Sequence, residues 1–140
     1  SLMGLLNESF SQGGFKDIFG DYSDFLSYIP TSFEREIDIL LITNNPIDTN
    51  EIIAYNIIEV KRVKFDESAL VQLLQYEDWF LNKKVNGDSS MLRTTAIAAS
   101  FSDSVKDYLA KRERYEGKRV LLLRYENSGQ GFRLYDEENR

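Results

Sequence analysis

Apolar residues along the chain follow two spacings, one typical of strands and one typical of helices. Isoleucine-rich segments over 34–43 and 51–62 predict two strands, because β-branched residues favour extended structure. Residues 67–84 predict the clearest helix, with Asp66 as its N-cap. The apolar stripe of this helix comprises Leu70, Leu73, Leu74, Phe80 and Leu81.

The rest of the chain predicts shorter elements of both kinds. They are a helix over 3–12, a weakly helical aromatic segment over 15–28, a strand over 94–101, a helix over 102–115, a strand over 118–125 and an edge strand over 131–135. Helices that alternate with apolar strands predict an α/β sandwich with a mixed sheet. No repeat, linker or low-complexity tract interrupts the pattern, so residues 1–140 are predicted to form a single domain.

The composition removes several kinds of chemistry. The chain has no cysteine and no histidine. Disulfides, cysteine zinc sites, histidine metal sites and Ser–His or Cys–His pairs are therefore excluded. Any catalysis must use carboxylates, lysine, tyrosine or hydroxyl groups.

No segment of the chain is predicted to enter a membrane. No apolar run approaches the roughly 20 residues needed to cross a bilayer, and the start lacks the charged region of a secretory signal. We therefore expect a cytoplasmic protein with no membrane partner. Ser1-Leu2 ahead of Met3 looks like an expression scar, so residues 1–2 were not used to predict the fold.

The formal net charge of −6 argues against tight, autonomous binding to phosphates, which lysine and arginine drive. Basic residues are nevertheless clustered at 61–64, 83–84 and 111–114. Some of the acids form the kind of cluster that a metal site needs, and a bound divalent ion would reverse the local charge.

Three polar residues interrupt the two isoleucine-rich strands. Glu59 and Lys61 lie two apart, so they project from the same face of their strand. Asp38 is similarly isolated among apolar neighbours on the preceding strand. Two buried acids on neighbouring strands repel each other unless a cation lies between them, and oxygen ligands without His or Cys favour Mg²⁺ or Mn²⁺. A salt bridge at the strand ends is the alternative interpretation of the same residues.

The helix that follows carries a second polar pair. Gln72 and Tyr76 are four residues apart and share one face, which Trp79 and Lys83 continue as a partly exposed stripe. Together with Asp38 and the Glu59-Val60-Lys61 segment, this helix resembles the PD-(D/E)xK nuclease superfamily, specifically its RecB-like branch with a Gln-x-x-x-Tyr helix. Ile37 stands where the family name has proline.

The resemblance implies a restriction-endonuclease-like αβββαβ core and specific residue roles. Asp38, Glu59 and the Val60 carbonyl would hold the metal ion, and Lys61 would act near the attacking water and the scissile phosphate. Gln72 and Tyr76 would position the substrate or the lysine. A further glutamate often comes from the first helix in this family, and Glu8 is the candidate here. The alternatives are Glu34 and Glu36, and an ordinary exposed helix residue is the other interpretation of Glu8.

The predicted function is a Mg²⁺- or Mn²⁺-dependent DNA nuclease, with DNA favoured over RNA. The alternative is a catalytically silent nuclease-fold module that binds DNA or protein. Homodimerisation and a DNA-binding partner domain both remain open. The residues expected to contact nucleic acid are Lys64, Trp79, Lys83 and Lys84, with residues 111–114 as a further basic group. The aromatic residues of segment 15–28 are expected to form a packing layer, with base stacking as the alternative.

Overall fold

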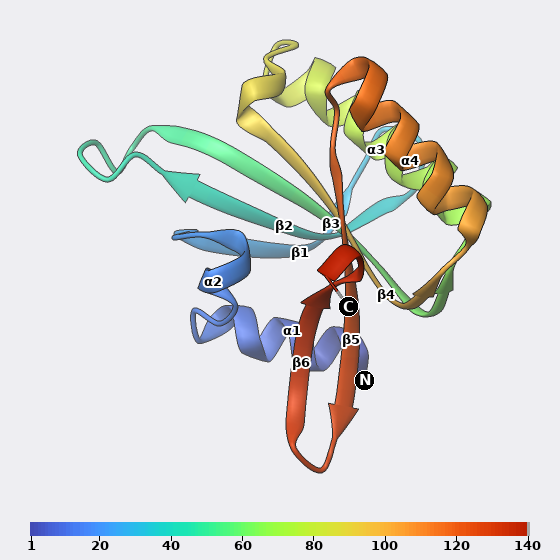
Figure 1. The fold of residues 1–140 in the computed structure, drawn as a ribbon. Coiled ribbons are helices and arrows are strands. Elements are labelled where there is room, and N and C mark those ends of the chain that lie inside the picture. The colour runs from blue at the N-terminus through green and yellow to red at the C-terminus, as the bar shows by residue number, and fades with distance from the viewer. Residues whose placement is uncertain (140) are drawn as a thin grey trace.

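The computed structural model describes residues 1–139, which build one mixed sheet covered by helices on both faces (Figure 1). The helices are α1 (Leu2–Ser11), α2 (Lys16–Phe19), α3 (Glu67–Lys84) and α4 (Asp103–Glu116). The strands are β1 (Asp24–Pro30), β2 (Glu36–Asn44), β3 (Ile52–Phe65), β4 (Leu92–Phe101), β5 (Val120–Ser128) and β6 (Gly131–Asp136). Short 3₁₀ turns cover Ser89–Met91 and Glu137–Asn139.

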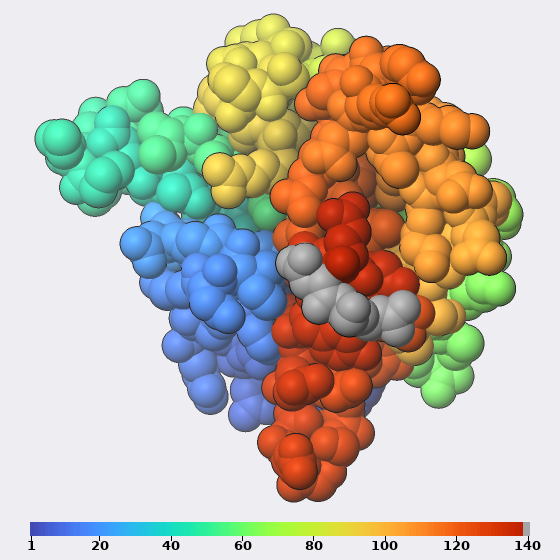
Figure 2. Space-filling view, in the orientation of Figure 1, coloured from blue at the N-terminus to red at the C-terminus, as the bar shows by residue number. Residues whose placement is uncertain are grey.

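The strands lie in the sheet in the order in which they occur along the chain. β1, β2 and β3 pair antiparallel, β3, β4 and β5 pair parallel, and β6 returns antiparallel beside β5. The predicted αβββαβ core is confirmed, with α3 and α4 making the crossovers between the parallel strands. The β2–β3 hairpin extends well beyond the body of the molecule, as the space-filling view shows (Figure 2).

Two apolar layers hold the sheet between its helices. On one face Leu73 and Phe80 of α3 and Val105 of α4 pack on the sheet. On the other face Leu6 and Phe10 of α1 pack on a layer that includes Ile39, Ile58, Ile97 and Leu123 of the central strands. Each strand of the sheet core thus contributes alternate residues to opposite layers, because successive strand side chains point to opposite faces.

The segment 15–28 departs from the prediction. Only residues 16–19 are helical, and Asp24–Pro30 forms the edge strand β1 paired to β2. Its aromatic residues Phe15, Phe19, Tyr22 and Phe25 join the layer under α1, which confirms their packing role. The same prediction was wrong for Tyr28, which is 51% exposed. Two further details differ at the start of the chain, where Ser1 caps α1 by accepting a hydrogen bond from the Gly4 N–H at 3.1 Å and Leu2 begins the helix.

The predicted helix caps and the hairpin agree with the structure. The Asp66 side chain accepts a hydrogen bond from the Ala69 N–H at 3.0 Å, which satisfies one free donor at the start of α3. The strands β5 and β6 form the expected hairpin, with Ser128 paired to Gly131. Among the helices of residues 1–139, none is long and apolar enough to cross a membrane.

Candidate active site

The site begins where β2 and β3 separate. Their antiparallel pairing runs as far as Ile39 opposite Ile58 and ends there. Continued by one step, the same register places Asp38 opposite Glu59, and residues opposite each other in such a pair share a face of the sheet. The Asp38 Oδ2 atom accepts a hydrogen bond from the Val60 N–H at 2.8 Å. The carboxylate thus bonds a backbone donor at the point where the ladder ends, which holds Asp38 against β3.

Glu59 is the charged group whose environment is most unusual. It is only 3% exposed, and its Oε2 atom is buried without a hydrogen-bond partner among the described residues. The pKa of the Glu59 carboxyl is raised to about 9, first by burial and then by a hydrogen bond with Asp38 and the negative charge of Asp38, while Lys61 and a backbone hydrogen bond at Val60 lower it. Two carboxyl groups pressed together in this way hold a proton or a cation between them.

Lys61 lies on the same face of β3 as Glu59, two residues further along, and is half-buried. The neighbouring strand gives both side chains room. Glu59 pairs with Ala96 and Lys61 with Ala98, and both alanines are fully buried. The small residues of β4 therefore leave space above the sheet that the long charged side chains occupy.

Helix α3 brings the second polar pair to the same face. Gln72 Nε2 donates a hydrogen bond of 2.6 Å to Tyr76 Oη. Burial raises the pKa of the Tyr76 hydroxyl, and the charges of Glu59 and Asp38 raise it too, while the hydrogen bond to Gln72 and the charge of Arg35 lower it. Tyr76 belongs to the same apolar layer as Ile57 and Ala96, and Glu59 projects on the same side of β3 as Ile57, so the Tyr76 hydroxyl and the carboxylate pair share one side of the sheet.

One expectation about this face was wrong. The polar stripe of α3 was predicted to be partly exposed, but Tyr76 is 1% exposed and belongs to the apolar core under α3. The Phe33 ring stacks on it, with 5.8 Å between the ring centroids. Tyr76 is therefore a core residue whose hydroxyl alone reaches the polar site.

Glu8 is not joined to the site by any described contact. It is exposed on α1, which packs on the opposite layer of the sheet from α3. The alternatives Glu34 and Glu36 are exposed as well. Within residues 1–139 no group of three or more His, Cys, Asp or Glu side chains is placed to hold a metal ion. The role of Glu8 stays a prediction.

The predicted nucleic-acid contacts lie along α3. Lys64 precedes the helix, whereas Lys83 and Lys84 end it, and all three are exposed. Trp79 is half-buried, and Lys84 Nζ lies 5.6 Å from its ring centroid. Since 18 helical residues extend about 27 Å, the basic residues at the two ends cannot contact the same phosphate.

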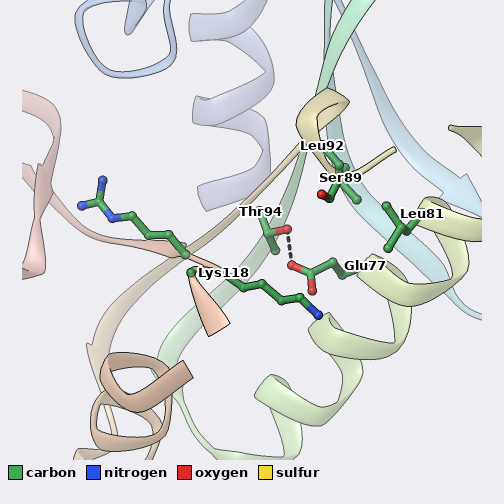
Figure 3. A pocket seen from close by; sticks show the side chains of 8 residues that line it. Glu77, Leu81, Ser89, Leu92, Thr94 and Lys118 are labelled. Atoms are coloured by element: carbon green, nitrogen blue, oxygen red, sulfur yellow. Dashed lines mark hydrogen bonds between the residues drawn. The ribbon is translucent and has the colours of Figure 1, made fainter. Parts of the chain in front are cut away.

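Residues 111–114 were expected to contact nucleic acid as a basic group, but Arg112 is not free to bind phosphate. It is 9% exposed and forms an ion pair with Glu77 of α3. Glu77 also accepts a hydrogen bond of 2.6 Å from Thr94 Oγ1, beside a hollow that Lys118 partly lines (Figure 3). This buried pair ties α3 to α4 and to the sheet.

Sequence reasoning missed two residues of the turn between β1 and β2. Arg35 lines a hollow with Gln72 and Gln75 of α3, and Phe33 covers Tyr76. Arg35 also carries a positive charge that lowers the pKa of the Tyr76 hydroxyl. The sequence offered no signal for either residue, because the turn lies 32 or more positions before the helix that it contacts.

Asp38 and Glu59 offer the oxygen donors that a hard divalent cation prefers, but two carboxylates do not fill its coordination shell. The Glu59 oxygen without a partner is available as a cation ligand, and burial together with the neighbouring Asp38 raises the pKa of Glu59, so a positive charge between the two acids would be stabilising. Mg²⁺ and Mn²⁺ prefer such oxygen donors and commonly keep several waters. Two carboxylates are a sufficient set only if backbone oxygen and water complete the coordination.

Comparison with solved structures finds the same α/β fold in two endonucleases. The chain is similar to a repair endonuclease from Pyrococcus abyssi, with a TM-score of 0.58 and 19% identity over 86% of this chain. It is also similar to EndoMS in its complex with double-stranded DNA, with a TM-score of 0.51 and 16% identity over 84% of this chain.

These likenesses establish the fold. The chain spans less than half the length of those two proteins, 45% and 44% respectively. No family model matches the chain, and no curated protein sequence matches it. The RecB-like branch therefore remains a prediction from the Gln72 and Tyr76 spacing.

Proposed function

We propose that the protein is a metal-dependent DNA nuclease that hydrolyses phosphodiester bonds at Asp38, Glu59 and Lys61. The observation that carries the proposal is the opposition of Asp38 and Glu59 at the end of the β2–β3 ladder, with one Glu59 oxygen buried and unpartnered. The fold shared with a repair endonuclease and with EndoMS bound to double-stranded DNA supports nuclease activity and DNA as substrate.

Asp38, Glu59 and the Val60 carbonyl are the groups that would hold Mg²⁺ or Mn²⁺. When bound, such a cation lowers the pKa of a coordinated water and stabilises the charge that develops on the phosphate. The chain's own residues supply the rest. Lys61, on the same strand face as Glu59, donates hydrogen bonds to the phosphate oxygens. The hydrogen-bonded Gln72 and Tyr76 limit the movement of the site side chains between α3 and the sheet.

The test is metal-dependent cleavage of DNA by the wild type and by Glu59→Gln and Lys61→Met. Both substitutions keep approximately the shape of the side chain. We expect cleavage to require Mg²⁺ or Mn²⁺, to stop with chelator, and to fall about 10²-fold or more in each variant. The exposed Lys16 on α2 provides the matched control, since Lys16→Met removes one positive charge on the opposite face of the sheet from α3. Equal cleavage by wild type and Glu59→Gln would disprove the proposed site.

A catalytically silent module is the second candidate. The net charge of −6 and the absence of a third carboxylate from the described cluster favour it. Under this alternative the wild type binds DNA or a protein but cleaves no substrate with either metal. An acidic chain that covers less than half of its structural neighbours also leads us to propose that a partner domain or a second copy adds contacts to DNA, which cleavage measured against protein concentration would reveal.

A further inference from the structure

The exposed side of α3 carries two hollows that meet at one residue. The first, of about 330 Å³, lies beside the Gln72–Tyr76 pair, and the second, of about 360 Å³, lies toward the end of the helix. Gln75 lines both of them. The first is lined by Arg35, Ser68, Val71, Gln72 and Gln75, and the second by Phe33, Gln75, Asp78, Trp79, Asn82 and Lys83. Together they form one surface, which we call the α3 groove.

The α3 groove is physically linked to the candidate active site. Gln72 lines its first half and donates to the Tyr76 hydroxyl, whose pKa responds to the charges of Glu59 and Asp38. Phe33 lies beside both Tyr76 and Trp79, because its ring stacks on Tyr76 and makes an edge contact with Trp79 at 6.5 Å between centroids. Gln72 and Trp79 are seven positions apart on α3, which corresponds to about 10 Å along the helix axis.

The second half of the groove has the chemistry of a base-stacking site. Phe33 is 36% exposed and lines this half together with Trp79, so part of its ring is open to a ligand although Tyr76 covers one of its faces. Gln75 and Asn82 offer amide groups to the edge of a base, and Lys83 offers a positive charge to its phosphate. The volume lies within the range of about 300–1,000 Å³ found for small-ligand sites.

The net charge of the chain favours an unpaired base over an intact duplex as the ligand of the α3 groove. A chain with a net charge of −6 gains little from phosphate contacts alone, whereas aromatic stacking contributes about 1–3 kcal/mol per base whatever the charge. Bases in an intact duplex are already stacked on their neighbours and cannot enter a side pocket. Only an unpaired base can lie on Phe33 and Trp79.

We propose that the α3 groove binds an unpaired nucleobase of the strand whose phosphate lies at Asp38, Glu59 and Lys61. The preferred substrate is accordingly DNA with at least one unpaired base near the cleaved bond. That the bound DNA is also a substrate rests on the proposed nuclease function. The binding of the base can be measured without cleavage.

Trp79 makes the binding test direct, because it is the only tryptophan of the chain and its emission reports on the groove alone. The metal-free protein is titrated with oligodeoxythymidylate, with an abasic strand of equal length and with a duplex of equal length. We expect quenching by the thymidylate strand, and an affinity at least about ten-fold weaker for the abasic strand and for the duplex.

Phe33→Ala and Phe33→Leu should both weaken thymidylate binding about ten-fold and leave abasic binding unchanged, since leucine keeps apolar volume but cannot stack. Tyr108→Ala, an exposed aromatic on α4, is the matched control and should bind as the wild type does. Equal affinity for thymidylate and abasic strands overturns the proposal. Binding seen by anisotropy without any change in Trp79 emission also overturns it.

Cleavage separates this inference from the proposed function. If the wild type cleaves both single strands and duplex and Phe33→Leu cleaves both equally well, the base site is refuted while the nuclease function stands. If no substrate is cleaved but thymidylate still quenches Trp79 and abasic DNA does not, the nuclease function fails and the base site stands as that of a binding module.

Discussion

Neutralising Glu59 should change how the stability of the metal-free protein depends on pH. In the unfolded chain the Glu59 carboxyl ionises near its ordinary pKa of 4.5, whereas burial and Asp38 hold its pKa in the folded protein at about 9. Between those two values, unfolding releases a proton. The contribution of Glu59 to stability is therefore complete below about pH 4.5 and is lost progressively as the pH rises toward 9.

The size of the effect follows from proton linkage. One proton released on unfolding lowers the free energy of unfolding by about 1.4 kcal/mol per pH unit, or about 4 kcal/mol from roughly pH 5 to pH 8. We therefore expect the stability of the wild type to fall by about 4 kcal/mol over this range. Glu59→Gln keeps the shape of the side chain but cannot ionise, so it should lose most of this slope and exceed the wild type in stability near pH 8.

Urea unfolding followed by circular dichroism, in chelator and at several pH values, measures the slope for both proteins. Glu116→Gln, which neutralises an exposed carboxylate at the end of α4, should reproduce the wild-type profile. Millimolar Mg²⁺ should raise the stability of the wild type at high pH and leave Glu59→Gln nearly unchanged, because the proposed cation replaces the proton. Parallel pH profiles for the wild type and Glu59→Gln would refute this account of the pair.

Two further predictions concern the framework that carries the site. Asp66→Ala removes the cap of α3 and should cost about 1 kcal/mol of unfolding free energy in urea, with Asp107→Ala on the exposed face of α4 nearly neutral. Arg112→Met leaves Glu77 buried with Thr94 alone and should cost about 3 kcal/mol, most of which the double variant with Glu77→Gln should recover. A double variant as unstable as Arg112→Met would show that lost packing, rather than the unpaired charge, causes the loss.

The spacing of apolar residues along the chain was sufficient to predict most strands of the sheet and the helices that connect them. The apolar stripe of α3 with its Asp66 cap, and the isoleucine-rich strands β2 and β3, were predicted to within a few residues because their periodicity is long and unambiguous. Residues 24–28, which end the predicted helical segment 15–28, were predicted wrongly, because they belong to the strand β1. Its apolar residues Phe25, Leu26, Tyr28 and Ile29 fit a helical spacing as well as a strand, and pairing with β2 decides between them.

The candidate site likewise combines features that the sequence predicted with features that only the fold decides. Spacing alone placed Glu59 and Lys61 on one face of a strand, and Gln72 and Tyr76 on one face of a helix, since both pairs depend on the geometry of a single element. The opposition of Asp38 and Glu59 depends on the register between β2 and β3. A shift of one residue in that register, which includes an irregularity at Thr43/Asn44, would turn one acid away from the other.

The sequence by itself thus determined which residues can do the chemistry and which elements carry them, because these properties arise from neighbours along the chain. Only the tertiary structure decided that Asp38 meets Glu59 where the ladder ends, that Arg112 is committed to Glu77, and that Phe33 covers Tyr76. Each of these contacts joins residues 20 or more positions apart. Their energies come from burial and charge in a shared environment, which forms only when the sheet and both helix layers pack together.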